Sequence, residues 1–129
     1  MNIEKTFKNL IYINLILLAG IIVSSFYPTL PSELYNWDGY TEFQIQALLW
    51  LGIPLILIYI VSLILILNFK SYGRSWFLFA TVFGTVTILV MGPFISAPID
   101  EFISFSSAVI DGVLLGMMYF SPLKDKFSK

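Results

Sequence analysis

The sequence predicts an all-α integral membrane protein, a bundle of four transmembrane helices whose two termini both lie in the cytoplasm. Three observations lead to this fold class: a strongly apolar composition, four long stretches almost without charge, and basic residues confined to alternate connections. Hydrophobic residues make up 58% of the 129 residues and charged residues 12%, which lies outside the range of ordinary soluble domains. Because no linker or repeat is visible, residues 1–129 are expected to form one membrane domain.

The charged residues leave four stretches of 22 to 27 residues, and the only charge within them is Asp111. A hydrocarbon core of about 30 Å is crossed by roughly 20 helical residues, so each stretch is long enough for one span. Prolines, an Asp-Gly pair and scattered polar residues mark residues 28–42 as the one substantial loop, which we expect outside the cytoplasm. The expected spans are approximately 10–27, 43–69, 75–96 and 102–120.

The first span is preceded by Lys5 and Lys8 and is stopped by Pro28. A cleavable secretory signal is the alternative, because small residues precede Phe26 and the two lysines would suit a positive n-region. The apolar stretch of 18 residues, however, exceeds the roughly 7 to 15 residues of a signal peptide. A retained helix is therefore the preferred interpretation.

The second span is apolar nearly all round in its second half, which is typical of a helix with wide lipid exposure. Pro54 lies near its outer end. A proline inside a helix leaves a backbone carbonyl without its usual donor and kinks the helix. We therefore expect a bend close to residue 51.

The third span carries small and hydroxyl-bearing residues, among them Gly84, Thr85 and Thr87. Small residues let helix backbones approach closely, and threonine hydroxyls can form hydrogen bonds between helices. This face of the third span is expected to point into the bundle.

The fourth span follows Pro98 and carries Asp100 and Glu101 in its first turn, where acidic groups complement the helix dipole. Farther along, Ala108, Gly112 and Gly116 recur at every fourth residue. This small-xxx-small pattern permits close helix crossing. Packing within the bundle is the first interpretation, and contact with a second copy of the chain is the other.

The basic residues fix the expected orientation. Short loops rich in lysine and arginine remain in the cytoplasm, so a partition of seven basic residues against none across alternate connections predicts that both termini are inside. We expect a multi-pass protein of the cell membrane, the plasma or inner membrane of a prokaryote. The seven residues are Lys5, Lys8, Lys70, Arg74, Lys124, Lys126 and Lys129.

Asp111 is the one charge inside a predicted span. It lies nine residues from Phe102 and nine from Phe120, which places it near the middle of the fourth helix. A carboxyl at this depth costs roughly 2.5 to 3.5 kcal/mol on the translocon scale. It must therefore find polar partners in this chain or in a neighbouring one.

Two interpretations of Asp111 stay open. As a functional group it would form a proton or cation site, together with Ser107, Thr85 and Thr87. As a structural group it would be a protonated carboxyl that donates a hydrogen bond to one of the two threonines or to Asn14.

Cysteine and histidine are both absent from the sequence. Their absence removes thiol nucleophiles and the usual zinc and haem ligands, so we expect no enzyme, no cofactor and no metal centre. The net charge of −1 gives no reason to expect nucleic-acid binding.

The function that this sequence predicts is a non-enzymatic membrane module that forms homo-oligomers or serves as an accessory subunit of a larger membrane assembly. Its expected partners are the lipid bilayer and either a second copy or a larger membrane protein. The small residues Gly84, Ala108, Gly112 and Gly116 would provide the helix contacts. The alternative is a channel or transporter subunit that moves protons or cations with Asp111 as its intramembrane site.

Overall fold

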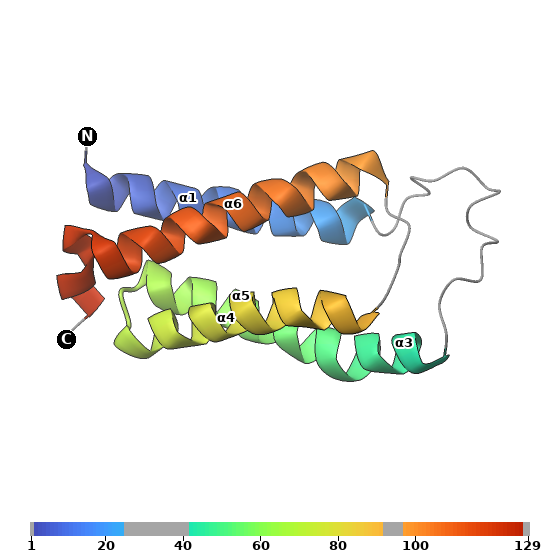
Figure 1. The fold of residues 1–129 in the computed structure, drawn as a ribbon. Helices are drawn as coiled ribbons and strands as arrows, with labels where there is room; N and C mark the ends of the chain where they lie inside the picture. The colour runs from blue at the N-terminus through green and yellow to red at the C-terminus, as the bar shows by residue number, and fades with distance from the viewer. Residues whose placement is uncertain (1, 25–41, 92–96, 128–129) are drawn as a thin grey trace.

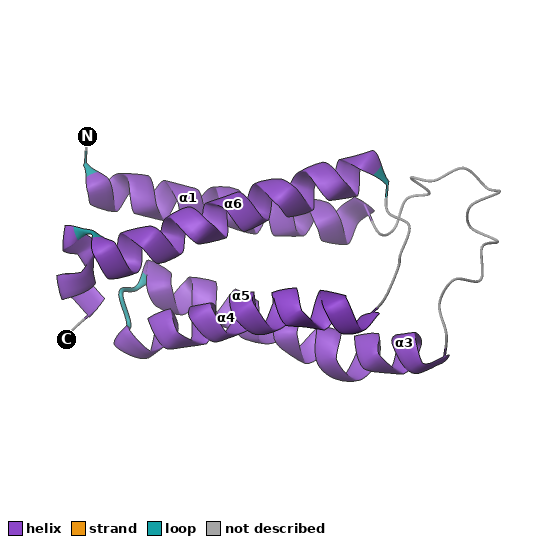
Figure 2. Ribbon diagram, in the orientation of Figure 1, coloured by secondary structure: helices purple, strands orange, loops and turns teal. Residues whose placement is uncertain are grey.

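The structure is a computed structural model that describes residues 2–24, 42–91 and 97–127, and every element in these ranges is a helix (Figures 1 and 2). The predicted all-α fold class is therefore confirmed. Residues 28–41 of the predicted loop and residues 92–96 of the predicted third span lie outside the described ranges. The elements are α1 (Ile3–Ser24), α3 (Glu42–Ala47), the π-helix η1 (Leu48–Gly52), α4 (Ile53–Leu67), α5 (Ser71–Met91), α6 (Pro98–Phe120) and the 3₁₀ helix η2 (Pro122–Phe127).

Within the described ranges, three helical stretches are long and apolar enough to cross a membrane: Ile3–Ser24, Leu49–Leu67 and Pro98–Phe120. The helix α5 is of similar length but is not among them. Its first turns are polar, and glycine and threonine replace aliphatic residues along one side. The structure thus supports a membrane protein with three candidate spans.

The helices pack as two antiparallel pairs, α1 with α6 and α4 with α5 (Figure 1). Both chain ends and the turn between α4 and α5 lie at one end of the bundle, which we call the termini end. The first residues of α6 and the last residues of α1 lie at the other end, which we call the opposite end.

A closely packed core occupies the half of the bundle next to the termini end. Its members come from the four long helices α1, α4, α5 and α6 and from the 3₁₀ helix η2. Side chains from these five elements fill this half of the bundle. They are Phe7, Ile11, Leu63, Ile66, Phe77, Leu114, Met118, Leu123 and Phe127.

The C-terminal segment, expected only as a basic tail, folds back as η2 and contributes two core side chains, Leu123 and Phe127. Ser121 starts this turn, because its hydroxyl accepts a hydrogen bond from the backbone N–H of Leu123 at 3.1 Å. Lys126 forms an ion pair with Glu4 at the start of α1. The tail therefore connects the two ends of the chain.

Local chemistry explains where α1 and α6 begin. The side-chain oxygen of Asn2 accepts hydrogen bonds from the backbone N–H groups of Glu4 and Lys5, at 3.1 and 3.3 Å, which is a helix N-cap. The helix α1 thus starts before the apolar stretch. Pro98 begins α6 with Asp100 in its first turn, as expected, and Asp100 accepts a hydrogen bond from the Ser24 hydroxyl at 2.6 Å.

The irregularity expected at Pro54 takes the form of the π-helix η1, which directly precedes α4. Pro54 has no backbone N–H to donate to the preceding turn. A π-helical turn is a known way for a helix to absorb such a disruption.

Candidate functional site

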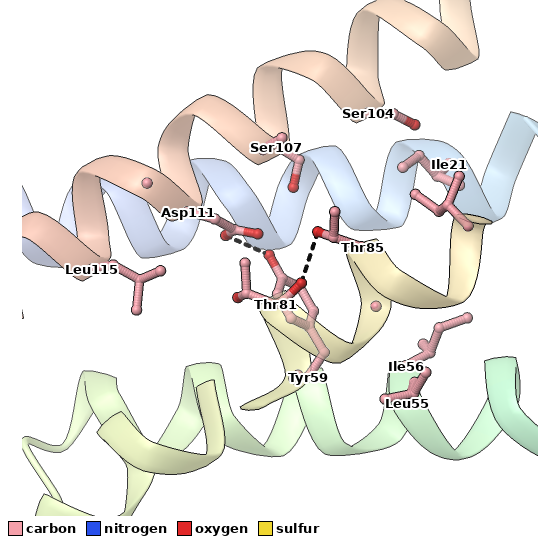
Figure 3. Close-up of a pocket in the computed structure, with 15 residues that line it drawn as sticks. Ile21, Leu55, Ile56, Tyr59, Thr81, Thr85, Ser104, Ser107, Asp111 and Leu115 are labelled. Carbon is pink, nitrogen blue, oxygen red and sulfur yellow. Dashed lines mark hydrogen bonds between the residues drawn. The ribbon is translucent and has the colours of Figure 1, made fainter. Parts of the chain in front are cut away.

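Asp111 lies in the middle of α6 and is 7% exposed. Its Oδ1 atom accepts two hydrogen bonds, one from the side-chain amide of Asn14 on α1 at 2.6 Å and one from the hydroxyl of Tyr59 on α4 at 2.7 Å. Figure 3 shows the Tyr59 hydroxyl facing the carboxyl group from the other helix pair. Asp111 therefore joins the two helix pairs at the centre of the bundle.

Asn14 is fully buried and organises this polar layer. Its amide nitrogen also donates to the Tyr59 hydroxyl oxygen at 2.7 Å, and its amide oxygen accepts a hydrogen bond from the Ser107 hydroxyl at 2.5 Å. Each polar atom of the Asn14 side chain thus has a partner, which satisfies the requirement for buried polar groups. The layer of Asn14, Tyr59, Ser107 and Asp111 separates the closed core from the other half of the bundle.

The second carboxyl oxygen of Asp111, Oδ2, is bonded differently. The hydrogen bonds between described residues reach Oδ1 and not Oδ2. In the same part of the chain, no fully buried side-chain oxygen or nitrogen lacks a partner. Asp111 also lines a cleft, so its carboxyl group borders open space.

This cleft has a volume of about 490 Å³ and lies between the two helix pairs in the half of the bundle away from the termini end (Figure 3). All four long helices contribute to its wall, which is mainly apolar apart from Asp111, Tyr59 and a few hydroxyl groups. The lining residues are Ile21, Leu55, Ile56, Tyr59, Ala80, Thr81, Gly84, Thr85, Ile88, Ser104, Ser107, Ala108, Asp111, Gly112 and Leu115.

The expected hydrogen bonds between Asp111 and the threonines of α5 are not formed. The hydroxyl of Thr85 donates to the carbonyl of Thr81 at 2.9 Å, and that of Thr87 donates to Phe83 at 2.8 Å. Helical threonines often bond the carbonyl four residues earlier in this way. Thr85 lines the cleft with Asp111, whereas Thr87 is buried away from it.

The small residues that were expected to form close helix contacts are Gly84, Ala108, Gly112 and Gly116. A Cβ atom added to Gly84, Gly112 or Gly116 would meet no atom within 4 Å outside its own helix turn. Ala108 is exposed, and it lines the cleft together with Gly84 and Gly112. No described side chain therefore packs against the three glycines, and a close helix contact at these positions stays a prediction.

In the part of the chain that the structure describes, no lysine or arginine belongs to the lining of the cleft. Arg74 lies at the termini end, where its guanidinium group is 4.7 Å from the Tyr119 ring and 3.5 Å from the Met118 carbonyl oxygen. Within the described ranges, no three acidic, cysteine or histidine side chains gather in a way that could hold a metal ion.

Comparison with protein-family models, with curated proteins and with solved structures finds no match to this chain. The functional argument therefore depends on the geometry of the cleft and its carboxyl group.

Sequence reasoning identified Asp111, Ser107 and Asn14 as polar groups of the bundle but missed Tyr59. The available signal was a single tyrosine within the aliphatic run of the second span. An intramembrane tyrosine hydroxyl needs a partner, just as a carboxyl does. A predicted hydrogen bond between the tyrosine hydroxyl and the carboxyl group would have placed α4, rather than α5, next to Asp111.

Proposed function

We propose that this protein is a small, non-enzymatic channel or transporter subunit whose cleft binds a proton or cation at Asp111. The observation that supports this most strongly is that Asp111 lines the cleft while its Oδ1 atom is held by Asn14 and Tyr59. A carboxyl group fixed by two donors and open on one side is arranged to bind rather than only to bridge helices. Intramembrane carboxyl groups commonly belong to ion or proton pathways.

In this proposal the chain crosses the cell membrane four times, with α5 as the additional crossing and both termini in the cytoplasm. The distribution of basic residues supports this orientation. The closed core would then lie toward the cytoplasm, and the cleft would lie in the outer half of the bundle.

The first test is Asp111→Asn in proteoliposomes. We expect proton or monovalent-cation flux, followed with an enclosed indicator dye, to fall at least tenfold. Asparagine is nearly the same size, and its side-chain oxygen can still accept the bonds from Asn14 and Tyr59, so the fold should be retained. Helix content by circular dichroism and size-exclusion behaviour measure that retention.

Asp100→Asn is the matched control, because Asp100 lies in the first turn of α6 and outside the cleft lining. Its flux should equal that of the unmodified protein. If unmodified protein passes no proton or cation above protein-free liposomes, the proposal fails. Equal flux through the Asp111→Asn variant would exclude Asp111 as the site.

The second candidate is the oligomerising module or accessory subunit. It is favoured by the open surface beside Gly112 and Gly116, where no side chain of this chain occupies the space that a packed helix would fill. Small residues at such positions allow a second helix to approach closely. The partner would be a second copy or a larger membrane protein.

Cysteine crosslinking in liposomes tests this candidate. Gly116→Cys should form disulfide-linked dimers under mild oxidation, because the two helices would approach at this face. Ile99→Cys is the control on the same helix, at a side chain that is 50% exposed and lies about 100° around the helix axis from Gly116. Equal crosslinking at both positions, or none at Gly116, would contradict a homo-oligomer formed through this face.

A further inference from the structure

The cleft is too large and too apolar for a bare ion alone. We infer that its ligand is a lipophilic organic ammonium ion, with its nitrogen at Asp111 Oδ2 and its apolar body between the helices. This inference rests on the proposed function and specifies which class of cation the site takes.

Size gives the first argument. The volume of about 490 Å³ falls within the range of roughly 300 to 1,000 Å³ that small-molecule sites occupy. A proton or a metal ion needs a small fraction of this space.

The wall chemistry gives the second argument. Aliphatic side chains from different helices border the cleft, including Leu55, Ile56 and Leu115, all labelled in Figure 3. An apolar wall offers no ligands to an inorganic ion that has lost its water, whereas it packs favourably against the hydrocarbon body of an organic ligand. The wall therefore selects against a small, strongly hydrated ion and in favour of an organic one.

The polar groups give the third argument. Ca²⁺ takes about six to eight oxygen ligands and Mg²⁺ about six, but among the described residues Asp111 is the only acidic one in the lining. An ammonium group has at most four donor positions and can be satisfied by a carboxylate with one or two hydroxyl oxygens. The hydroxyl groups of Thr81 and Thr85 line the same cleft and keep acceptor capacity, since each donates its own proton to a helix carbonyl.

Charge complementarity gives the fourth argument. No lysine or arginine of the described ranges lines the cleft, so the described lining offers the carboxylate no counter-ion. A buried carboxylate is costly without a partner, and a cationic ligand would supply that partner. A neutral molecule of the same shape would leave the charge unpaired.

The test compares two rigid probes that differ in charge but hardly in shape, 1-adamantylammonium and 1-adamantanol. Binding to purified protein in lipid nanodiscs is measured by equilibrium dialysis with tritiated probe, against empty nanodiscs. We expect saturable binding of the ammonium probe and at least tenfold weaker binding of the alcohol. Asp111→Asn should weaken binding of the ammonium probe at least tenfold and leave binding of the alcohol unchanged.

A steric variant checks the location independently of the charge. Gly84→Leu places a side chain in the cleft, where an added Cβ meets no atom within 4 Å, so the variant should fold. It should weaken binding of both adamantyl probes at least tenfold while leaving Asp111 in place. Unchanged binding in this variant would show that the probe sits elsewhere and would overturn the inference.

The inference and the proposed function can fail separately. If unmodified protein shows Asp111-dependent proton or sodium flux but does not bind 1-adamantylammonium, the ligand class is wrong and the proposed function stands. If neither flux nor binding depends on Asp111, both fail.

Discussion

Replacing Gly73 with alanine should lower the free energy of unfolding by about 2 kcal/mol, within the range of overpacked cores. Gly73 lies in the first turn of α5, where this helix meets the end of α4. An added Cβ would lie 2.6 Å from the Leu65 Cβ atom and 3.0 Å from the Leu65 carbonyl carbon. Because the second of these atoms belongs to the backbone, the neighbour cannot move aside by changing a rotamer.

Gly84→Ala is the matched control on the same helix. No atom lies within 4 Å of its added Cβ, so the better helix propensity of alanine should leave stability unchanged or raise it by up to about 1 kcal/mol. Reversible unfolding in mixed micelles of a mild detergent and dodecyl sulfate measures both variants. A Gly73→Ala protein as stable as Gly84→Ala would show that α4 and α5 do not approach as closely as described.

This pair of glycines also shows what the sequence could and could not predict. The glycines that fit the small-xxx-small pattern, Gly112 and Gly116, border open space, whereas Gly73, which fits no such pattern, lies closely against Leu65. A small-xxx-small pattern indicates that another helix could approach the backbone closely. Whether a helix does so depends on how the two helices are rotated about their axes. In a bilayer this rotation is hard to infer, because lipid-facing and buried positions are both apolar.

The all-helical fold and the approximate positions of the helices were predictable, because solvent determines them. Charges must stay out of the hydrocarbon core, and a backbone in lipid must satisfy its own hydrogen bonds. Asp111 was identifiable for the same reason. Its partner Tyr59 and the open cleft were not, since both depend on contacts between helices that are distant in sequence.

The sequence did not predict that the C-terminal segment, Pro122–Phe127, folds back onto the core. Pro122–Phe127 looks polar in sequence because of its lysines, yet every fourth residue, Leu123 and Phe127, is buried. Six residues are too few for a periodic apolar pattern to stand out.

Phe127→Ala should therefore have the largest effect on stability, a loss of about 3 kcal/mol, at the lower end of what is usual for a buried phenylalanine. The Phe127 ring is fully buried, with its centroid 6.0 Å from that of Phe7 and 5.3 Å from that of Phe69. Phe69 has a φ of 54°, a left-handed conformation that is strained for a bulky residue. Packing in this aromatic cluster is what offsets that strain, so the loss of Phe127 should also loosen the turn between α4 and α5.

Hydrogen exchange followed by mass spectrometry separates loss of packing from loss of charge pairing. In Phe127→Ala, the amides of residues 123–127 and of the turn at 68–70 should exchange faster than in the unmodified protein. Lys126→Ala is the control, since it removes the ion pair with Glu4 and the cation–π contact of the Lys126 ammonium group with the Phe69 ring, 5.2 Å away, but leaves the packing of the three rings in place. Ion pairs near the surface contribute little to stability. If Lys126→Ala released the tail as fully as Phe127→Ala, the ion pair rather than the aromatic packing would hold the two chain ends together. We expect the opposite, because the Phe7 and Phe127 rings are fully buried, while the side chains of Lys126 and Glu4 remain 49% and 33% exposed.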